Sequence, residues 1–196
     1  MFLLGLTGSI GMGRSTTAEM FAAEGCAVWD ADAAVHRLYA KGGAAVAPMS
    51  EVFPNAIIDG AVSREALKEI IGRDPTALKQ IEGIVHPLVA QDRATSIAAA
   101  ENDIIVLDIP LLFETGGDAK MDSTACVRVD SETQRARVKA RGTMSAAQFE
   151  AIRAKQMPID EKCARADYVI ETDTLEHARQ QVQDVLKDIR KRTAHA

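Results

Sequence analysis

The stretch that decides the fold is Gly8-Ser9-Ile10-Gly11-Met12-Gly13-Arg14-Ser15-Thr16, which follows a short apolar run over residues 2–6. A phosphate-binding loop has a glycine, four variable residues, a second glycine, lysine, and then serine or threonine, and it joins a strand to a helix. This stretch meets every requirement but one, because Arg14 stands where lysine is expected. The glycines let successive backbone N–H groups turn toward phosphate oxygens, and the following helix N-terminus adds a positive dipole.

The residues expected to bind nucleotide belong to this loop and to the helix that it opens. The Ser15 hydroxyl would hold Mg²⁺, and the side chain at position 14 would lie against the transferred phosphoryl group. We therefore predict that ATP and Mg²⁺ are bound by Gly8, Gly11, Met12, Gly13, Arg14, Ser15 and Thr16. A glycine-rich turn without a ligand is the structural alternative, which the strand–loop–helix context disfavours.

A dinucleotide-binding loop is a second alternative. Gly11-Met12-Gly13 matches the start of that fingerprint, and Asp30 lies about where its ribose-binding acid would fall. Thr16, however, occupies the position of the third glycine, so a phosphate loop is the better interpretation.

Apolar runs outside the loop predict an α/β fold. Residues 2–6 are expected to form a buried strand, and four further strands are expected at 26–29, 104–109, 125–129 and 168–170. Helical patterns separate them, the first over residues 15–24, so crossovers would produce a three-layer, open, mostly parallel five-stranded sheet. The last helix would pack on this sheet through a stripe of Leu175, Ala178, Val182, Val185, Leu186 and Ile189.

Two helical insertions are expected within a single P-loop kinase domain. Residues 33–100 read as mostly helical, with breaks at Gly42-Gly43, Pro48, Pro54, Gly60, Pro75 and Pro87. A charged helical hairpin follows at about 131–165, and a capping box at Ser131-Glu132-Thr133-Gln134 would start its first helix. The core would then comprise about residues 1–32, 101–130 and 166–196, interrupted by helical insertions at about 33–100 and 131–165.

The composition limits the class of function. The chain has 196 residues and a formal net charge of −5, which argues against a protein that coats nucleic acid. Cys26, Cys126 and Cys163 show no metal-ligand or disulfide spacing, so we expect them to fill space in a reducing cytosol. No apolar run approaches the ~18 residues of a membrane span, so we predict a cytoplasmic protein with no membrane partner.

Three aspartates follow predicted strands or end them. Asp30 and Asp32 are two residues apart, so in an extended segment both would point into the crevice where open α/β sheets bind ligands. A carboxylate there can orient an acceptor hydroxyl, although both acids could instead cap the next helix. Asp108 ends an apolar strand as a magnesium-binding acid would, but an ordinary strand-terminal aspartate fits as well.

Arginines on the predicted hairpin are candidates for stabilising charge on phosphate. Among Arg135, Arg137 and Arg141, the last two are four residues apart and share a helix face. Phosphoryl transfer spreads negative charge over several oxygens, and a mobile helical lid could bring cations to that charge while excluding water. A solvated, salt-bridged helix face is the alternative.

These motifs, in order and over nearly the whole chain, resemble those of dephospho-CoA kinases. The phosphate loop, Asp30-Ala31-Asp32 and the segment Pro110-Leu111-Leu112-Phe113-Glu114 carry the resemblance most specifically. Further matches are His36, Arg64-Glu65-x-Leu67, Ile84-Val85-His86-Pro87, Gln134-x-x-Arg137-x-x-x-Arg141, Arg153-x-x-Gln156-Met157-Pro158 and Ala166-Asp167-Tyr168-Val169-Ile170.

The resemblance implies ATP-dependent phosphorylation of the ribose 3′-hydroxyl of dephospho-coenzyme A, the last step of coenzyme A synthesis. It also implies that the insertion at about 33–100 is a helical substrate-binding part and that the hairpin at about 131–165 is a lid. It implies that Asp32 receives or orients the acceptor hydroxyl and that Arg137 and Arg141 close over ATP as catalytic cations. The residues that it places near the acceptor are His36, Arg64, His86, Leu112 and Glu114. For the two histidines a purely structural role is an equal alternative. The resemblance does not fix an oligomeric state.

Position 14 departs from the family pattern, which has lysine there. Arg14 keeps the charge, but a guanidinium is longer, planar and forked, so the exchange is not conservative at a point-charge site. Together with Arg137 and Arg141, Arg14 is a predicted catalytic cation, and we expect it to lower turnover by a factor of order 10²–10³. The alternatives are a P-loop kinase of another small hydroxyl or nucleotide acceptor, and a nucleotide-binding protein that has lost turnover.

Overall fold

A computed structural model describes all 196 residues of the chain, which form two compact units. The first, here called the core unit, comprises Met1–Trp29 and Glu101–Ala196. The second, here called the helical unit, comprises Asp30–Ala100. Each unit has its own cluster of buried apolar side chains.

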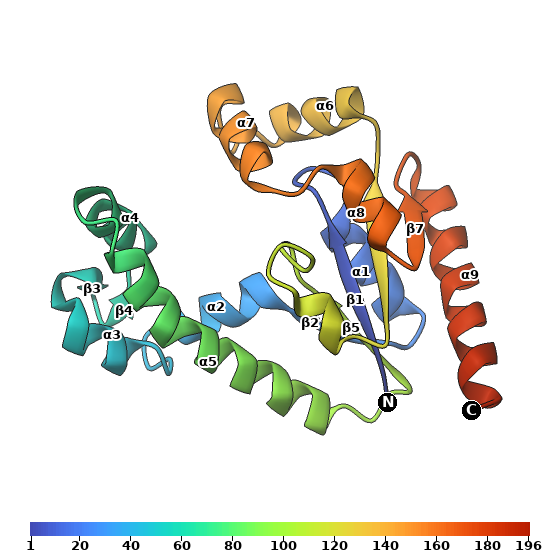
Figure 1. The fold of residues 1–196 in the computed structure, drawn as a ribbon, viewed down its shortest axis with the longest axis horizontal. Coiled ribbons are helices and arrows are strands. Elements are labelled where there is room, and N and C mark those ends of the chain that lie inside the picture. The colour runs from blue at the N-terminus through green and yellow to red at the C-terminus, as the bar shows by residue number, and fades with distance from the viewer. The chain divides into compact units, whose positions relative to one another are not determined.

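A five-stranded parallel sheet forms the centre of the fold, with strand order β2-β5-β1-β6-β7 (Figure 1). The strands are β1 (Phe2–Gly8), β2 (Ala27–Asp30), β5 (Ile104–Asp108), β6 (Ser123–Arg128) and β7 (Tyr168–Glu171). The predicted α/β fold and its five strands are therefore confirmed, with strand ends displaced by two residues or fewer.

The two faces of the sheet are covered differently because successive side chains of a strand point to opposite sides. Leu4 and Leu6 of β1 are fully buried in the larger apolar cluster, together with Phe21 of α1 (Arg14–Ala23) and Val182 of α9 (Leu175–Ala194). Helices α1 and α9 thus form one outer layer, as Figure 1 shows behind and beside the strands.

The apolar stripe of α9 is shorter than the sequence predicted. Leu175 is 64% exposed, so its assignment to the stripe is wrong, whereas the buried members are Ala178, Val182, Val185, Leu186 and Ile189. Leu175 is the first residue of α9, directly after the capping residue Thr174, and its side chain lies beyond the edge of the buried stripe.

The opposite face of the sheet is covered by the segment after β5, which includes the 3-10 helix η2 (Gly117–Lys120), and by α8 (Ile159–Arg165). A Cβ atom at Gly5 would lie 2.8 Å from Leu112 and 2.9 Å from Met121, so glycine is what allows this close packing. Leu112 is consequently fully buried, and its expected position near an acceptor stays a prediction.

The predicted helical hairpin is present as α6 (Ser131–Arg141) and α7 (Ala146–Lys155), but its cap was assigned wrongly. The N-cap of α6 is Asp130, whose carboxylate accepts a hydrogen bond of 2.8 Å from the Thr133 backbone N–H. Ser131 is therefore already helical, and the Gln134 side chain donates to the Ile10 carbonyl instead of to the start of its own helix. The capping box occurs at the start of α7, between Ser145 and Gln148.

The helical unit contains four helices and, unpredicted, a small β-hairpin. Its elements are α2 (Ala31–Tyr39), α3 (Val46–Val52), the 3-10 helix η1 (Pro54–Ala56), β3 (Ile57–Ile58), β4 (Ala61–Val62), α4 (Arg64–Arg73) and α5 (Ala77–Ala99). The hairpin turns at Asp59-Gly60, where both residues have positive φ angles, of 53° and 80°. Asp-Gly is a favoured pair for such a turn. The hairpin was not predicted because two strands of two residues each are too short to show an alternating apolar pattern.

Two of the predicted helix breaks are wrong. Pro48 lies in the first turn of α3, where a backbone N–H has no partner within the helix in any case. Pro87 lies inside α5, and the helix continues through it because neighbouring residues such as Ile81 and Val85 are buried in the apolar cluster of this unit.

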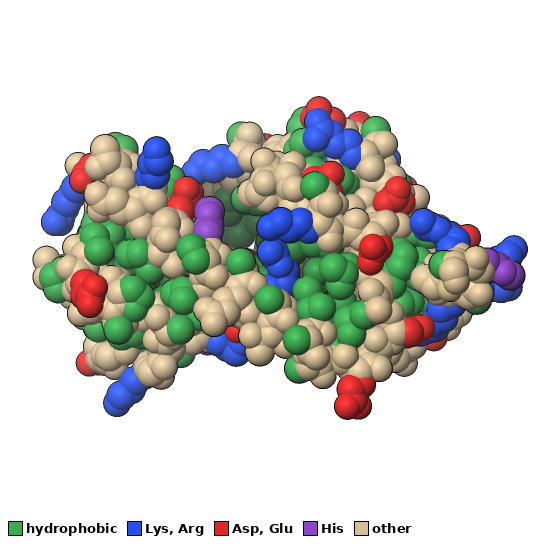
Figure 2. Space-filling model, turned by 60° about the horizontal axis from the view of Figure 1, so that its bottom comes forward, with side chains coloured by type: hydrophobic (Ala, Val, Ile, Leu, Met, Phe, Trp, Pro, Cys, Tyr) green, Lys and Arg blue, Asp and Glu red, His purple; other side chains and the backbone are tan.

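The charge distribution on the surface and the hydropathy of the helices each bear on what the protein can bind. Figure 2 shows basic and acidic side chains interspersed over the face in view, without a continuous basic surface. No helix combines the length and the apolar character that a membrane-spanning segment needs.

Candidate functional site

The phosphate loop connects the end of β1 to the first residue of α1. Gly11 and Gly13 have φ angles of 74° and 85°, in the left-handed region that favours glycine. Space is also limiting, because a Cβ atom at Gly11 would lie 2.6 Å from Val138, and one at Gly8 would lie 2.5 Å from Val127. The predicted strand–loop–helix is thus present, and its glycines are required by both backbone conformation and packing.

Side chains from distant elements hold the loop backbone in place. Gln134 of α6 donates a 2.7 Å hydrogen bond to the Ile10 carbonyl. The side-chain amide oxygen of Gln156, Oε1, accepts hydrogen bonds from the Ile10 backbone N–H at 3.2 Å and from the Ser9 hydroxyl at 3.1 Å. Both amides were part of the sequence resemblance, but reasoning from residue type did not assign them to the loop, because amides carry no charge signal.

The far end of the loop is fixed by Thr172, the residue after β7. Its hydroxyl donates a 2.6 Å hydrogen bond to the Met12 carbonyl. Arg137 of α6 in turn donates to the Thr172 hydroxyl at 3.1 Å and to the Thr172 carbonyl. The guanidinium of Arg137 is therefore positioned relative to the phosphate loop through a single intermediate residue.

A cavity of about 180 Å³ lies beside this arrangement. Its lining includes Gly13 of the loop, Thr16 of α1, Arg137 and Arg141 of α6, and Leu175 at the start of α9. The structure thus brings the predicted residues Arg137 and Arg141 to the same cavity as the end of the phosphate loop. Arg135 does not line it and instead forms an exposed ion pair with Glu150 of α7.

Arg14 forms an ion pair with Asp108. The Nε atom of Arg14 lies 2.5 Å from Oδ1 of Asp108 at the end of β5, and the two side chains are 16% and 2% exposed. The cation that replaces the expected lysine is therefore in contact with the carboxylate predicted to bind magnesium. Ser15 and Thr16 follow in the first turn of α1 with exposed side chains.

A buried lysine at the base of the loop was missed by the sequence analysis. The Lys162 side chain of α8 has no exposed surface, and its ammonium group donates to the carbonyls of Gly8 at 3.2 Å and Pro110 at 3.0 Å. It also forms a 3.0 Å ion pair with Glu114, whose same oxygen accepts from the Met157 backbone N–H. A charged residue within the polar helix 159–165 is normally exposed, so no local pattern could have revealed this position.

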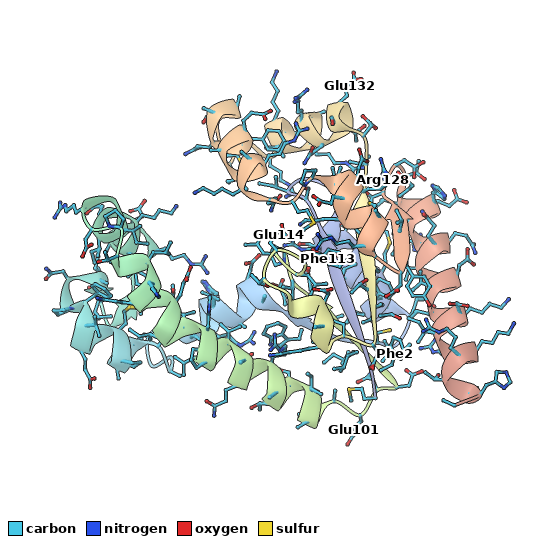
Figure 3. All side chains as sticks on the ribbon, viewed as in Figure 1. Phe2, Glu101, Phe113, Glu114, Arg128 and Glu132 are labelled. Atoms are coloured by element: carbon cyan, nitrogen blue, oxygen red, sulfur yellow. The ribbon has the colours of Figure 1, made fainter.

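Glu114 is accordingly a structural link in the core unit. Figure 3 labels it in the segment that follows β5, pointing toward the elements around the phosphate loop. Its carboxylate joins that segment to α8 and to Met157 at the end of the hairpin. Its expected contact with an acceptor stays a prediction.

The predicted acceptor-site residues of the helical unit lie on α2, α4 and α5. Asp30 ends β2 and caps α2, with its carboxylate accepting from the backbone N–H groups of Asp32 at 2.8 Å and Ala33 at 3.1 Å. The expectation of an extended Asp30–Asp32 pair is therefore wrong, since Asp32 is already in the first helical turn. The capping alternative holds for Asp30.

Other predicted residues of this unit have exposed side chains. His36 and His86 are exposed on α2 and α5, so neither is a buried structural histidine. Arg64, the first residue of α4, places its guanidinium 5.6 Å from the centre of the Tyr39 ring, a cation–π contact. The side chain of Arg64 is thereby oriented although it is exposed.

Comparisons with known proteins agree on one family. The family model described as dephospho-CoA kinase matches residues 2–177. A dephospho-CoA kinase from Ruegeria pomeroyi is 68% identical over 195 residues, covering 100% of this chain and 99% of the relative. A dephospho-CoA kinase from Cereibacter sphaeroides is 58% identical, covering 96% of each chain.

Solved structures show the same architecture. The crystal structure of the protein TT1252 from Thermus thermophilus superposes on this chain with a TM-score of 0.85 at 31% identity, covering 95% of this chain and 96% of that one. A dephospho-CoA kinase from Campylobacter jejuni has a TM-score of 0.70 at 24% identity, covering 97% and 98%. Together with the matched family model, these similarities establish that the chain belongs to the dephospho-CoA kinase family of P-loop kinases.

Proposed function

We propose that this kinase transfers the γ-phosphoryl group of ATP to the ribose 3′-hydroxyl of dephospho-CoA, giving coenzyme A and ADP. The observation that carries the proposal is the glycine-rich phosphate loop, fixed by Gln134, Gln156 and Thr172, in a chain of this family. A loop held at both ends would present its remaining N–H groups to a phosphoryl group with little reorganisation, as electrostatic stabilisation requires.

ATP would bind across the loop and the neighbouring cavity. The triphosphate would lie against the backbone of residues 8–14 and the N-terminus of α1. The cavity beside Gly13, Thr16 and Arg137 would accept part of the adenosine, because it opens directly from the end of the loop. Arg137 and Arg141 would then face the nucleotide from α6 and offset its negative charge.

Oxygen ligands at the start of α1 and at the end of β5 fit Mg²⁺. Ser15 offers a hydroxyl oxygen, and Asp108 offers a carboxylate oxygen next to Arg14, the residue preceding Ser15. Magnesium in kinases takes few protein oxygens and completes its shell with phosphates and water. When bound, it would neutralise charge on the phosphates, while Ser15 and Asp108 hold it at the loop.

Asp32 is our proposed residue for the acceptor hydroxyl. It lies in the first turn of α2, two residues after β2, a strand of the sheet that carries the phosphate loop. With an ordinary carboxylate pKa of ~3.9 it would be a weak base, so we assign it mainly the orientation of the hydroxyl. Exposed side chains of His36, Arg64 and His86 in the same unit would bind the polar groups of dephospho-CoA.

An ADP-release assay with Mg²⁺-ATP tests the proposal, with dephospho-CoA and a panel of nucleosides and nucleotides as acceptors. Among these acceptors, we expect turnover only with dephospho-CoA. We expect ³¹P NMR of the product to show a phosphate on the ribose 3′-oxygen. Faster turnover with any other acceptor would contradict the proposed substrate. The three free cysteines are compatible with the reducing cytoplasm in which we expect the reaction to occur.

A nucleotide-binding protein without turnover is favoured by one specific observation, the Arg14–Asp108 ion pair. That pair draws the position-14 cation toward β5. Tight ATP binding in calorimetry together with no ADP formed in the presence of dephospho-CoA would support this second function.

A further inference from the structure

Two of the three cysteines lie side by side in the core unit. The sulfur atoms of Cys126 in β6 and Cys163 in α8 are 3.7 Å apart, although the residues are separated by 37 positions in the chain. Cys126 is fully buried, whereas Cys163 is partly exposed. The third cysteine, Cys26, is buried in the apolar cluster on the other face of the sheet.

The contact follows from the fold. Ala125 and Val127 belong to the apolar cluster packed under α1 and α9, so the alternation of β6 sends Cys126 to the opposite face. Helix α8 covers β6 on that face and presents Cys163 to it. No part of the proposed phosphoryl transfer uses either thiol.

The surroundings of Cys163 favour its ionised form. A hydrogen bond with Cys126, assisted by the positive charge of Arg128, lowers the pKa of Cys163 to about 7. Arg128 ends β6 and is held next to α8 by ion pairs with Asp160 at 3.4 Å and Glu171 at 3.2 Å, and Figure 3 labels it there. The same hydrogen bond, together with burial, raises the pKa of Cys126.

We propose that Cys163 is a thiol-exchange site for low-molecular-weight disulfides, and that Cys126 resolves the adduct to form a Cys126–Cys163 disulfide. The Cys163 thiolate attacks one sulfur of a small disulfide RS–SR, forming Cys163–S–SR and releasing RS⁻. Cys126 then loses its proton to that RS⁻ and attacks the Cys163 sulfur, which forms the protein disulfide and releases the second RS⁻. The second RS⁻ takes up the proton that Cys163 released when it ionised, so the two protein thiols are oxidised and RS–SR is reduced to two equivalents of RSH.

The disulfide would act on the phosphate loop through the residue next to Cys163. Bond formation must bring the sulfurs from 3.7 Å to about 2.05 Å, which draws α8 toward β6. Lys162 holds the Gly8 and Pro110 carbonyls from that short helix, so its hydrogen bonds must shift as well. Displacements of about 1 Å near a reacting group can lower turnover by up to about 100-fold. Disulfides in reducing compartments are typically transient and redox-sensing, as this one would be.

Mass spectrometry of the intact protein tests the chemistry independently of activity. We incubate the full chain with oxidised glutathione, and expect the loss of two hydrogens, no retained glutathionyl group, and a Cys126–Cys163 cross-linked peptide. Cys126→Ser should stop at the mixed disulfide on Cys163, and Cys163→Ser should not react. Cys126→Ala repeats the first variant in case a serine hydroxyl disturbs the buried strand. A stable mixed disulfide on the wild-type chain, or modification of Cys26 at an equal rate, would overturn the proposal.

The pH dependence of native alkylation gives a second readout. Because the thiolate is the nucleophile, the iodoacetamide rate at Cys163 should rise with pH through a midpoint near 7. Burial raises the pKa of Cys26 to about 11, so this residue serves as the internal control and should be labelled only after unfolding. A midpoint at the ordinary thiol pKa of about 8.5 would contradict the assigned environment.

The effect on activity rests on the proposed function and is measured separately. ADP release with dephospho-CoA should fall about tenfold or more in the disulfide form and recover with dithiothreitol, and the Cys163→Ser variant should be insensitive to oxidised glutathione. Disulfide formation with unchanged turnover would overturn the coupling through Lys162. A chain that never turns over dephospho-CoA would refute the proposed function alone, because the mass readout would still decide the thiol chemistry.

Discussion

At the scale of single residues, Arg14 is the side chain that we expect to limit the turnover of this kinase. Its Nε atom contacts Asp108, so the guanidinium is held at the end of β5 as well as at the loop. We expect Arg14→Lys to raise kcat by a factor of order 10²–10³, because a compact ammonium group can lie against the transferred phosphoryl group. Steady-state ADP release measures this, with Arg14→Ala as the control that removes the charge. Equal rates for the arginine and lysine proteins would show that the guanidinium serves as well.

Lys162 is the residue whose loss should cost the most stability. Lys162→Met leaves Glu114 in a poorly exposed site without its cation, and such a loss typically costs about 3–5 kcal/mol. The double variant Lys162→Met with Glu114→Gln removes both charges and should recover part of that free energy of unfolding. Urea denaturation measures both. If the double variant were no more stable than the single one, the ion pair would not be the source of the effect.

At the scale of elements, the cap of α6 controls the order of the helix that carries Arg137 and Arg141. Asp130→Ala removes the carboxylate that accepts from Thr133, so amide hydrogen exchange in the first turn of α6 should become faster. Asp130→Asn is the matched control, because asparagine caps helices equally well. A serine-capped helix starting at Ser131 would instead leave exchange unchanged in both variants.

The pH dependence of this cap has a defined sign. The backbone and side-chain hydrogen bonds from Thr133 lower the pKa of Asp130 in the folded protein. A depressed carboxylate pKa stabilises the fold above the unfolded value of ~3.9, and the contribution is lost as the pH falls through the folded value. The difference in exchange between wild type and Asp130→Ala should therefore be full at pH 6 and shrink below about pH 4. A constant difference down to pH 2 would exclude the charged cap.

At the scale of the whole molecule, the two units should respond to different ligands. A non-hydrolysable ATP analogue with Mg²⁺ should protect the amides of residues 8–16 and 172–178 from hydrogen exchange, because these residues form the loop and the cavity beside it. Dephospho-CoA should add protection in Asp30–Ala100, the unit with Asp32, His36, Arg64 and His86. At a concentration of 100 Kd each ligand should add about 2.7 kcal/mol to the free energy of unfolding. Protection by dephospho-CoA confined to the core unit would refute our acceptor-site assignment.

Local patterns along the chain determined the fold class and the phosphate loop. Apolar runs identify strands from a few contiguous residues, and Gly11 and Gly13 are required by the positive φ angles of their own loop. Gly8 is required instead by its packing against Val127 of β6. The same kind of reasoning failed where a competing interaction was stronger, as at Asp32, which is helical because Asp30 caps α2. It also placed the α6 cap at Ser131 one residue too late.

Only the tertiary structure decided which side chains meet across elements. Lys162 reaches a carbonyl 154 positions away, Cys126 and Cys163 are 37 positions apart, and Arg14 of α1 pairs with Asp108 of β5. Such contacts depend on strand order and on which helix covers which face of the sheet. Neither property can be predicted from the spacing of the contacting residues along the chain. The sequence by itself therefore predicted a phosphate-binding loop after β1, because one continuous segment forms that loop. The tertiary structure decided what holds the loop, what the cation at position 14 contacts, and which two thiols lie side by side.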